Sequence, residues 1–143
     1  MKANGKTEAA VMEVVDQFNE AYARRDMDTL LALIAPDSDV VLLGTGADER
    51  RVGPAEFKFQ AERDWSQTDA LAFELGWNSI SAAGSVAWLA AEATGRGRVN
   101  GQEMSFPLRM TVVLEQRNDK WLFVQMHVSA PAAGQAEGES IPT

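Results

Sequence analysis

The chain has 143 residues, of which 45% are hydrophobic and 24% charged, and its net charge is −8 at pH 7. This length and balance are typical of one globular domain with a substantial core. The negative charge argues against nucleic acid and anionic membrane surfaces as partners, and no apolar run is long enough to span a bilayer.

The cysteine and histidine content limits the chemistry further. There is no cysteine and only one histidine, so disulfides, thiolate sites and a zinc or iron site built from protein ligands are not expected. The chain also lacks a dinucleotide-binding motif, and we expect no cofactor. Its first residues, MKANGKTEAAV, lack the apolar stretch of a signal peptide, so the expected location is the cytoplasm.

Two helices are predicted near the beginning of the chain. Apolar residues recur at helical spacing over residues 8–25, and Thr7 is placed to cap this helix. A shorter helix follows, with Asp26 as its cap and Pro36 as its stop. Each helix has one apolar face to bury.

A short strand, a loop and a third helix come next. The apolar segment DVVLLG, residues 39–44, predicts a strand, and the polar segment GTGADERRVG that follows predicts a loop. Pro54 occupies the favoured first position of a third helix, which runs to about Ser66.

From residue 69 onward the apolar pattern has a period of two, which is typical of strands. Turn signals at Ala83–Gly84, Asn100–Gly101 and Asn118–Asp119 divide this half into four antiparallel strands. The strands are predicted near residues 70–81, 85–98, 102–117 and 120–129.

These elements predict a single α+β domain over residues 1–131. Because each helix has one apolar face, all three are expected to cover one side of a strongly curved antiparallel sheet, with a cavity between the two layers. Residues 132–143 are small and acidic, and we expect this tail to be disordered.

The order of elements resembles the NTF2-like superfamily and, within it, the SnoaL-like group. The similarity lies in VVDQFNEAYARRDMDTLLALIAPDSDV, RVGPAEF and TVVLEQRNDKWLFVQMHVSAP, the last of which is also similar to the closing strands of the calcium/calmodulin-kinase association domain. The resemblance implies a cone-shaped fold and a homodimer formed through the sheet. It leaves the activity open, because the superfamily includes isomerases, cyclases, hydrolases, dehydratases, transport factors and assembly domains.

Ketosteroid isomerase is a relative in fold whose chemistry is not implied. Its mechanism needs a carboxylate base near the end of the first strand, and an oxyanion hole made of a tyrosine and a protonated acid. The matching positions here are Gly44, Phe18 and Thr111, which supply none of these groups.

Two carboxylates are candidate acid/base groups. Asp64 lies beside Trp65 near the end of the third helix, and a dry cavity there would raise its pKa. The preferred interpretation, however, is that Trp65 packs in the core while Asp64 faces solvent. Glu92 is the second candidate, because strand alternation puts it on the same face as Trp88.

The single histidine, His127, lies on the last strand. Alternation gives this strand one wholly apolar face, which suits the cavity, and one mixed face: Trp121, Phe123, Gln125, His127 and Ser129. On this interpretation His127 is structural and belongs to a two-fold interface between sheets. The alternative turns the sheet over and makes His127 a cavity base held by Glu92 or Glu115.

Arg109 lies in FPLRMTVVL, a strand that is expected to be largely buried, and a buried arginine needs a carboxylate partner or an anionic ligand. A strict two-residue turn at Asn118–Asp119 would set Met110 opposite His127 and turn Arg109 to the other face. A bulged turn would instead set Arg109 opposite His127. The sequence leaves both registers open.

Other residues are predicted to line a ligand pocket. The loop after the first strand lacks a phosphate-binding motif, but it lies where the cone is expected to open, so Thr45 and Glu49 would meet a ligand. Aromatic residues would suit a flat apolar ligand, and the candidates are Tyr22, Phe57, Trp65 and Trp88.

Three hypotheses of function follow. The leading one is a pocket protein for a compact, largely apolar organic molecule. The second is a cofactor-independent isomerase, cyclase or hydrolase, with Asp64 or Glu92 as acid/base group and Arg109 or His127 polarising the substrate. The third is a non-catalytic dimerisation module, whose cone would be filled by aromatic side chains.

Overall fold

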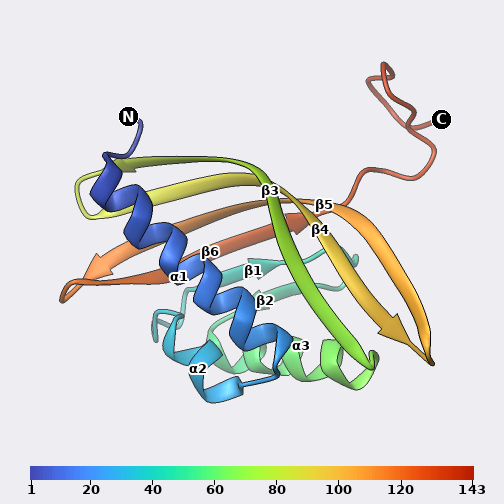
Figure 1. Cartoon of the computed structure of the whole chain (residues 1–143), viewed down its shortest axis with the longest axis horizontal. Helices are drawn as coiled ribbons and strands as arrows, with labels where there is room; N and C mark the ends of the chain where they lie inside the picture. Colours follow the sequence, from blue (N-terminus) through green and yellow to red (C-terminus); the bar gives the residue numbers. More distant parts are fainter.

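The computed structural model describes residues 1–143 and contains three helices and a six-stranded sheet (Figure 1). The helices are α1 (Gly5–Ala23), α2 (Met27–Ala32) and α3 (Pro54–Ser66). The strands are β1 (Val41–Leu43), β2 (Arg50–Val52), β3 (Ala70–Ala83), β4 (Val86–Val99), β5 (Gln102–Arg117) and β6 (Lys120–Ser129). The predicted α+β class is therefore confirmed, and the sheet is open rather than closed into a barrel.

The strand order in the sheet is β2-β1-β6-β5-β4-β3. β3 to β6 form the predicted antiparallel meander, and its long strands bend around the helices in Figure 1. Asn100–Gly101 and Asn118–Asp119 have positive φ at both positions, as type I′ turns require. β1 joins the far edge of the meander by pairing parallel to β6.

The helix starts agree with the sequence patterns except at α1. The predicted Thr7 cap is wrong, because the side chain of Asn4 accepts a hydrogen bond from the Thr7 backbone N–H at 2.8 Å and α1 begins at Gly5. Asp26 caps α2 as predicted, and α3 begins at Pro54.

The predicted loop after β1 contains a strand. Arg50–Val52 form β2, which pairs antiparallel with β1 and sets Arg51 opposite Leu42. Alternation of apolar and polar residues could not identify it, because two of its three residues are arginines. Arg51 instead has an inward partner, since its Nε donates to Gln60 Oε1 at 2.8 Å.

The core lies between α1 and the inner face of the sheet. Its most deeply buried large residues come from α1, α2 and β4 to β6, and they are Val11, Val15, Leu30, Leu89, Val112, Leu114 and Phe123. No helix is both long and apolar enough to cross a membrane. The segment after Ser129 forms only turns and bends and extends away from the domain in Figure 1; its disorder stays a prediction.

A bulge in β6 decides the register that the sequence left open. The turn pairs Arg117 with Lys120, but Leu114 pairs with Phe123 and Val113 with Gln125, so Val124 is an extra residue in β6. Both predicted partners of His127 are therefore wrong. The bulge lies in the strand rather than in the turn, and it sets Thr111 opposite His127.

The bulge also changes which side chains of β6 face the helices. After it, Met126 is buried while Gln125 and His127 are exposed, as alternation predicted. Before it, the prediction is wrong: Trp121 and Phe123 are buried against the core and do not share the outer face with His127. The extra residue reverses the alternation at Val124.

Candidate functional site

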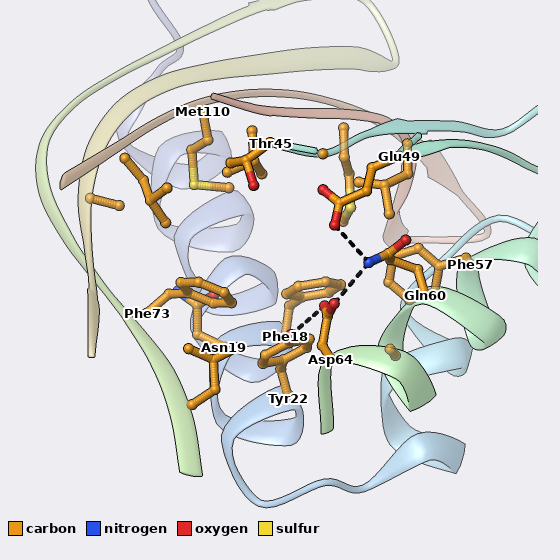
Figure 2. A pocket seen from close by; sticks show the side chains of 18 of the residues that line it. Phe18, Asn19, Tyr22, Thr45, Glu49, Phe57, Gln60, Asp64, Phe73 and Met110 are labelled. Carbon is orange, nitrogen blue, oxygen red and sulfur yellow. Dashed lines mark hydrogen bonds between the residues drawn. The ribbon is translucent and has the colours of Figure 1, made fainter. Parts of the chain in front are cut away.

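A cavity of about 200 Å³ lies between α1, α3 and the inner face of the sheet (Figure 2). Most of its lining is apolar, and Phe73, Phe106, Leu108, Met110, Phe123 and Met126 are among the residues that the sheet contributes. The polar lining comes from the two helices and from the loop between β1 and β2, where Thr45 lies exposed at the mouth.

The two helices present matching faces to the cavity. α1 contributes Val15, Phe18, Asn19 and Tyr22, and α3 contributes Phe57, Gln60, Ala61 and Asp64. Both sets have the spacing i, i+3, i+4, i+7, which places side chains on one side of a helix. The last residue of each face carries a side-chain oxygen, Tyr22 on α1 and Asp64 on α3, and these two side chains contact each other.

Asp64 and Tyr22 are joined by a short hydrogen bond. The Tyr22 hydroxyl donates to Asp64 Oδ2 at 2.6 Å, and Gln60 Nε2 donates to Asp64 Oδ1 at 2.8 Å. Gln60 is only 5% exposed, and its amide oxygen is held by Arg51. Each oxygen of the Asp64 carboxyl therefore has one fixed donor, and its position in the cavity is set from both helices.

The cavity changes the protonation chemistry of this pair. Burial raises the pKa of Asp64 above its ordinary value, and the nearby charge of Glu49 adds to the rise. The hydrogen bonds from Tyr22 and Gln60 act in the opposite direction without cancelling it. Burial, followed by the charge of Asp64, also raises the pKa of the Tyr22 phenol, which therefore stays a donor.

Glu49 brings a second carboxylate to the cavity. Its Oε2 accepts from the Gly46 backbone N–H at 2.7 Å, and its Oε1 accepts from Gln60 Nε2 at 3.1 Å and pairs with Arg63 at 2.9 Å. A side chain on Gly44 would overlap the Glu49 carboxylate. The end of β1 thus carries a carboxylate supplied by the following loop rather than by the strand.

A glycine in β4 shapes another wall of the cavity. Gly95 pairs with Phe106 across β4 and β5, and a side chain on Gly95 would overlap the Phe106 ring. The missing side chain allows the ring to lie across β4 and to line the cavity.

The structure brings together five of the predicted site residues: Tyr22, Thr45, Glu49, Phe57 and Asp64 all line the cavity. Trp65 and Trp88 are not part of the lining. Trp65 packs behind Tyr22, with ring centroids 5.7 Å apart, and Trp88 projects with Glu92 from the other face of β4. The aromatic wall is supplied instead by Phe18, Phe73, Phe106 and Phe123.

Three other candidates, Glu92, Arg109 and His127, lie together on the outer face of the sheet. All three are exposed, and with Trp77 they border a shallow groove there. The hypotheses that made them acid/base or substrate-polarising groups in the cone are therefore wrong, because these side chains lie outside the cavity. Arg109 is not buried, so it needs no carboxylate partner. His127 faces away from the cavity, as the preferred interpretation of β6 predicted.

Two polar residues of the lining, Asn19 and Gln60, were not predicted from the sequence. Helical spacing could have found both, because Asn19 lies three residues before Tyr22 and Gln60 lies four before Asp64. The structure contains no group of three or more histidine, aspartate or glutamate side chains that could hold a metal ion. Between Glu49 and Asp64 lies the N–H donor of Gln60, which favours acceptors and not cations.

A family model for the SnoaL-like domain matches residues 11–133, which is most of the chain. The chain belongs to the SnoaL-like domain family. None of the curated proteins matches this SnoaL-like protein in sequence.

Solved structures of NTF2-like proteins have the same fold as this SnoaL-like protein. An NTF2-like superfamily protein from Salmonella enterica has a TM-score of 0.83 at 16% identity, covering 97% of this chain and 100% of the other. A candidate dehydratase of the NTF2-like family from Streptomyces avermitilis has a TM-score of 0.81 at 21% identity, covering 91% and 100%. A candidate calcium/calmodulin-dependent protein kinase II association domain from Xanthomonas campestris has a TM-score of 0.77 at 25% identity, covering 92% and 90%. The predicted NTF2-like fold is confirmed, and these similarities concern the fold.

Proposed function

We propose that this SnoaL-like protein binds a compact, mostly apolar organic molecule in the cavity, with a polar end of the molecule against Asp64. The observation that carries the proposal is a half-buried carboxyl, held by Tyr22 and Gln60, at one side of a mostly apolar lining. Pockets for small molecules have this composition, a largely apolar wall with a few placed polar groups.

The size of the cavity limits the ligand. An engineered apolar cavity of about 150 Å³ binds benzene, and pockets for drug-sized ligands begin at about 300 Å³. The 200 Å³ found here lies between these values and suits a molecule of one or two rings. The open space also argues against the pure dimerisation module, whose cone would be filled by aromatic side chains.

The charge of the lining favours a neutral ligand. Glu49 and Asp64 both present carboxyl oxygens to the cavity, and Arg63 pairs with Glu49 from the side of α3. A ligand carboxylate would meet like charges in a site with little water, where such repulsion is strong. A hydroxyl or N–H group would instead find an acceptor in Asp64.

Calorimetric titration with 2-naphthol and naphthalene-2-carboxylate tests this function. We expect 2-naphthol to bind and the carboxylate to bind at least about tenfold more weakly, because like charges placed together are costly. In the variant Asp64→Asn the affinities for the two compounds should be closer, because one of the like charges is removed. The fold should tolerate this change, because the Tyr22 hydroxyl can turn and accept a hydrogen bond from the new amide. Absence of 2-naphthol binding, or equal affinity for the two compounds, would overturn the proposal.

The second candidate function is a cofactor-independent enzyme in which Asp64 moves a proton. Its raised pKa and its fixed position favour this reading, because a general base works best when its pKa approaches the working pH. The Streptomyces avermitilis protein is described as a candidate dehydratase, and elimination of water is a reaction that uses such a base. Isomerisation, cyclisation and hydrolysis stay open on the same grounds.

Deuterium exchange separates the enzyme from the binding protein. In the catalysed step the Asp64 carboxylate would take a proton from the carbon next to the carbonyl of 2-tetralone, so that an O–H bond forms and the electron pair of the broken C–H bond passes into the enolate. After the proton on Asp64 exchanges with D₂O, the enolate carbon would take back a deuteron, which restores the ketone and the carboxylate. We expect the wild type to accelerate this exchange in D₂O and Asp64→Asn to lose the acceleration while still binding 2-tetralone. Exchange at the same rate in both proteins would contradict an enzymatic role of Asp64.

A second copy of the chain is the partner that we infer for the outer face of the sheet. Glu92 and Arg109 are direct neighbours in the register of β4 and β5, yet they form no ion pair with each other or with another residue. Trp77, next to them, is 62% exposed. A two-fold axis through this face would let each Glu92 meet the partner copy's arginine, which is the self-complementary pattern of a symmetric dimer.

A further inference from the structure

Asn19 and Thr45 are the two polar residues of the cavity lining whose side chains have no partner, and Thr45 lies exposed at the mouth. The side chains of Tyr22, Glu49, Gln60 and Asp64 are all hydrogen-bonded within the chain. Asn19 also lines the cavity and is half-buried, but its amide forms no hydrogen bond with any residue of the chain. Figure 2 shows it on α1 beside Phe73, away from the hydrogen bonds that surround Asp64.

The fold has no structural use for an amide at this position. Asn19 is in the interior of α1, too far from either end to cap the helix, and it makes no bond to the helix backbone. Its neighbours on the same helical face are Val15 and Tyr22, so a leucine would fill the site equally well. The Asn19 side chain is only half-buried, and asparagine forms helices less readily than leucine.

The other donors in the cavity are already engaged. The Tyr22 hydroxyl and the Gln60 amide both donate to Asp64, and Gln60 also donates to Glu49. Arg63 is committed to Asp48 and Glu49. Inside the mouth, where Thr45 is exposed, the amide of Asn19 is therefore the side-chain donor left for a ligand.

We propose that the Asn19 amide donates a hydrogen bond to a carbonyl oxygen of the ligand, so that the cavity takes compact neutral carbonyl compounds. This inference rests on the proposed function and makes it more specific. Asn19 on α1 recognises the acceptor of the ligand, and Asp64 on α3 meets its donor or acidic proton. A polar site of this kind rejects an analogue that lacks the matching group, because the bound analogue would cover the amide without giving it a partner.

The test compares 2-tetralone with tetralin, the same two-ring hydrocarbon without the carbonyl oxygen. Affinities are measured by ligand-detected NMR titration of the full chain. We expect the wild type to bind 2-tetralone about tenfold more tightly than tetralin, as one buried hydrogen bond would give. Asn19→Leu is expected to lose this preference while binding tetralin at least as well as the wild type.

A matched control and a second variant keep the result clear. Gln17→Leu makes the same change from amide to leucine on the exposed side of α1, and it should keep the wild-type preference. Asn19→Asp keeps the size of the side chain but removes the NH₂ donor, and it should lose the preference as Asn19→Leu does. Unfolding curves of all variants show that each is folded.

The outcomes separate this inference from the function on which it rests. Binding of both probes by the wild type with equal affinity, or an unchanged preference in Asn19→Leu and Asn19→Asp, overturns the role of Asn19 and leaves the pocket intact. Binding of neither probe and of no 2-naphthol overturns the proposed function and this inference together.

Discussion

On the inner side of the sheet, Glu49 and Asp64 are held by hydrogen bonds within the chain, whereas on the outer side Glu92, Arg109 and His127 are exposed and have no side-chain partner. Both sides of the sheet therefore carry carboxylates, and they differ mainly in the burial and hydrogen bonding of these groups. Burial raises the pKa of Asp64 above its ordinary value. Surroundings, rather than residue type, identify the candidate site in this fold.

The largest expected effect is the loss of ligand affinity when the cavity is filled by a larger side chain. Ala61 lines the cavity and is 2% exposed, so in Ala61→Leu the added carbon atoms would occupy ligand space. We expect the affinity for 2-naphthol to fall about a hundredfold, which corresponds to the upper range of about 3 kcal/mol for overpacking. Ala55→Leu, on the exposed side of the same helix, is the control for titration calorimetry. Equal binding by both variants would place the ligand elsewhere.

The next largest effect is a difference in the free energy of unfolding when one hydroxyl is removed on the inner side of the sheet and one on the outer side. Tyr22→Phe leaves Asp64 Oδ2 without its donor in a partly buried setting, and we expect a loss of about 1–3 kcal/mol in the free energy of unfolding. Thr111→Val removes an exposed outer hydroxyl that makes no hydrogen bond, and its effect should stay within about 0.5 kcal/mol. Urea unfolding measures both. Equal effects would mean that the Tyr22–Asp64 bond contributes nothing particular.

Reversing a charge on the outer side should affect association and leave ligand binding unchanged. Glu92→Arg would oppose Arg109 across the inferred two-fold axis, and we expect the dimer to weaken about fivefold to tenfold because like charges then meet. The double variant Glu92→Arg, Arg109→Glu should restore association, since it exchanges the signs of a complementary pair. Sedimentation equilibrium gives the dissociation constants. A monomeric wild type would refute the inferred interface.

The pH dependence of stability should have opposite signs for an inner and a surface carboxyl. The pKa of Asp64 is raised in the folded state, so its stabilising contribution is fully present below the ordinary value near 3.9 and is lost as the pH rises through the folded value. Arg117 lowers the pKa of Asp37, so that contribution is present above the ordinary value and is lost as the pH falls.

Urea unfolding between pH 3 and pH 7 checks these signs. Relative to the wild type, Asp64→Asn should gain stability as the pH rises, and Asp37→Asn should gain as the pH falls. The effects are expected to be small, because Asp64 keeps two hydrogen bonds and Asp37 lies at the surface. A parallel pH dependence in the two variants would show that burial does not distinguish Asp64.

Periodicity and turn chemistry were sufficient to predict most of the fold. The Asn-Gly and Asn-Asp turns indicated the long strands, helical spacing indicated α1, and the start residues Asp26 and Pro54 indicated α2 and α3, because all these signals are local. β2 and the bulge at Val124 depend on contacts between distant segments: Arg51 is ordered by Gln60, and the bulge is visible only in the pairing of β5 with β6.

The site was predictable only in part for the same reason. The sequence showed Trp65 next to Asp64 in the chain. The aromatic residue that forms a hydrogen bond with Asp64 is instead Tyr22, which lies 42 residues earlier and could not be identified from the sequence. Glu49 was expected at the mouth, yet its carboxylate enters because Gly44 lacks a side chain. His127 was a candidate because it is the only histidine, but the pairing of β6 with β5 places it outside the cavity.

A carbon-13 NMR titration of the Asp64 side-chain carboxyl shows whether the cavity holds a half-buried, hydrogen-bonded acid that meets the ligand. Asp64 should titrate clearly above the ordinary aspartate pKa of about 3.9, and its signal should move when 2-naphthol is added. An Asp64 that titrates at the ordinary value, with a signal that does not respond to 2-naphthol, would contradict the account.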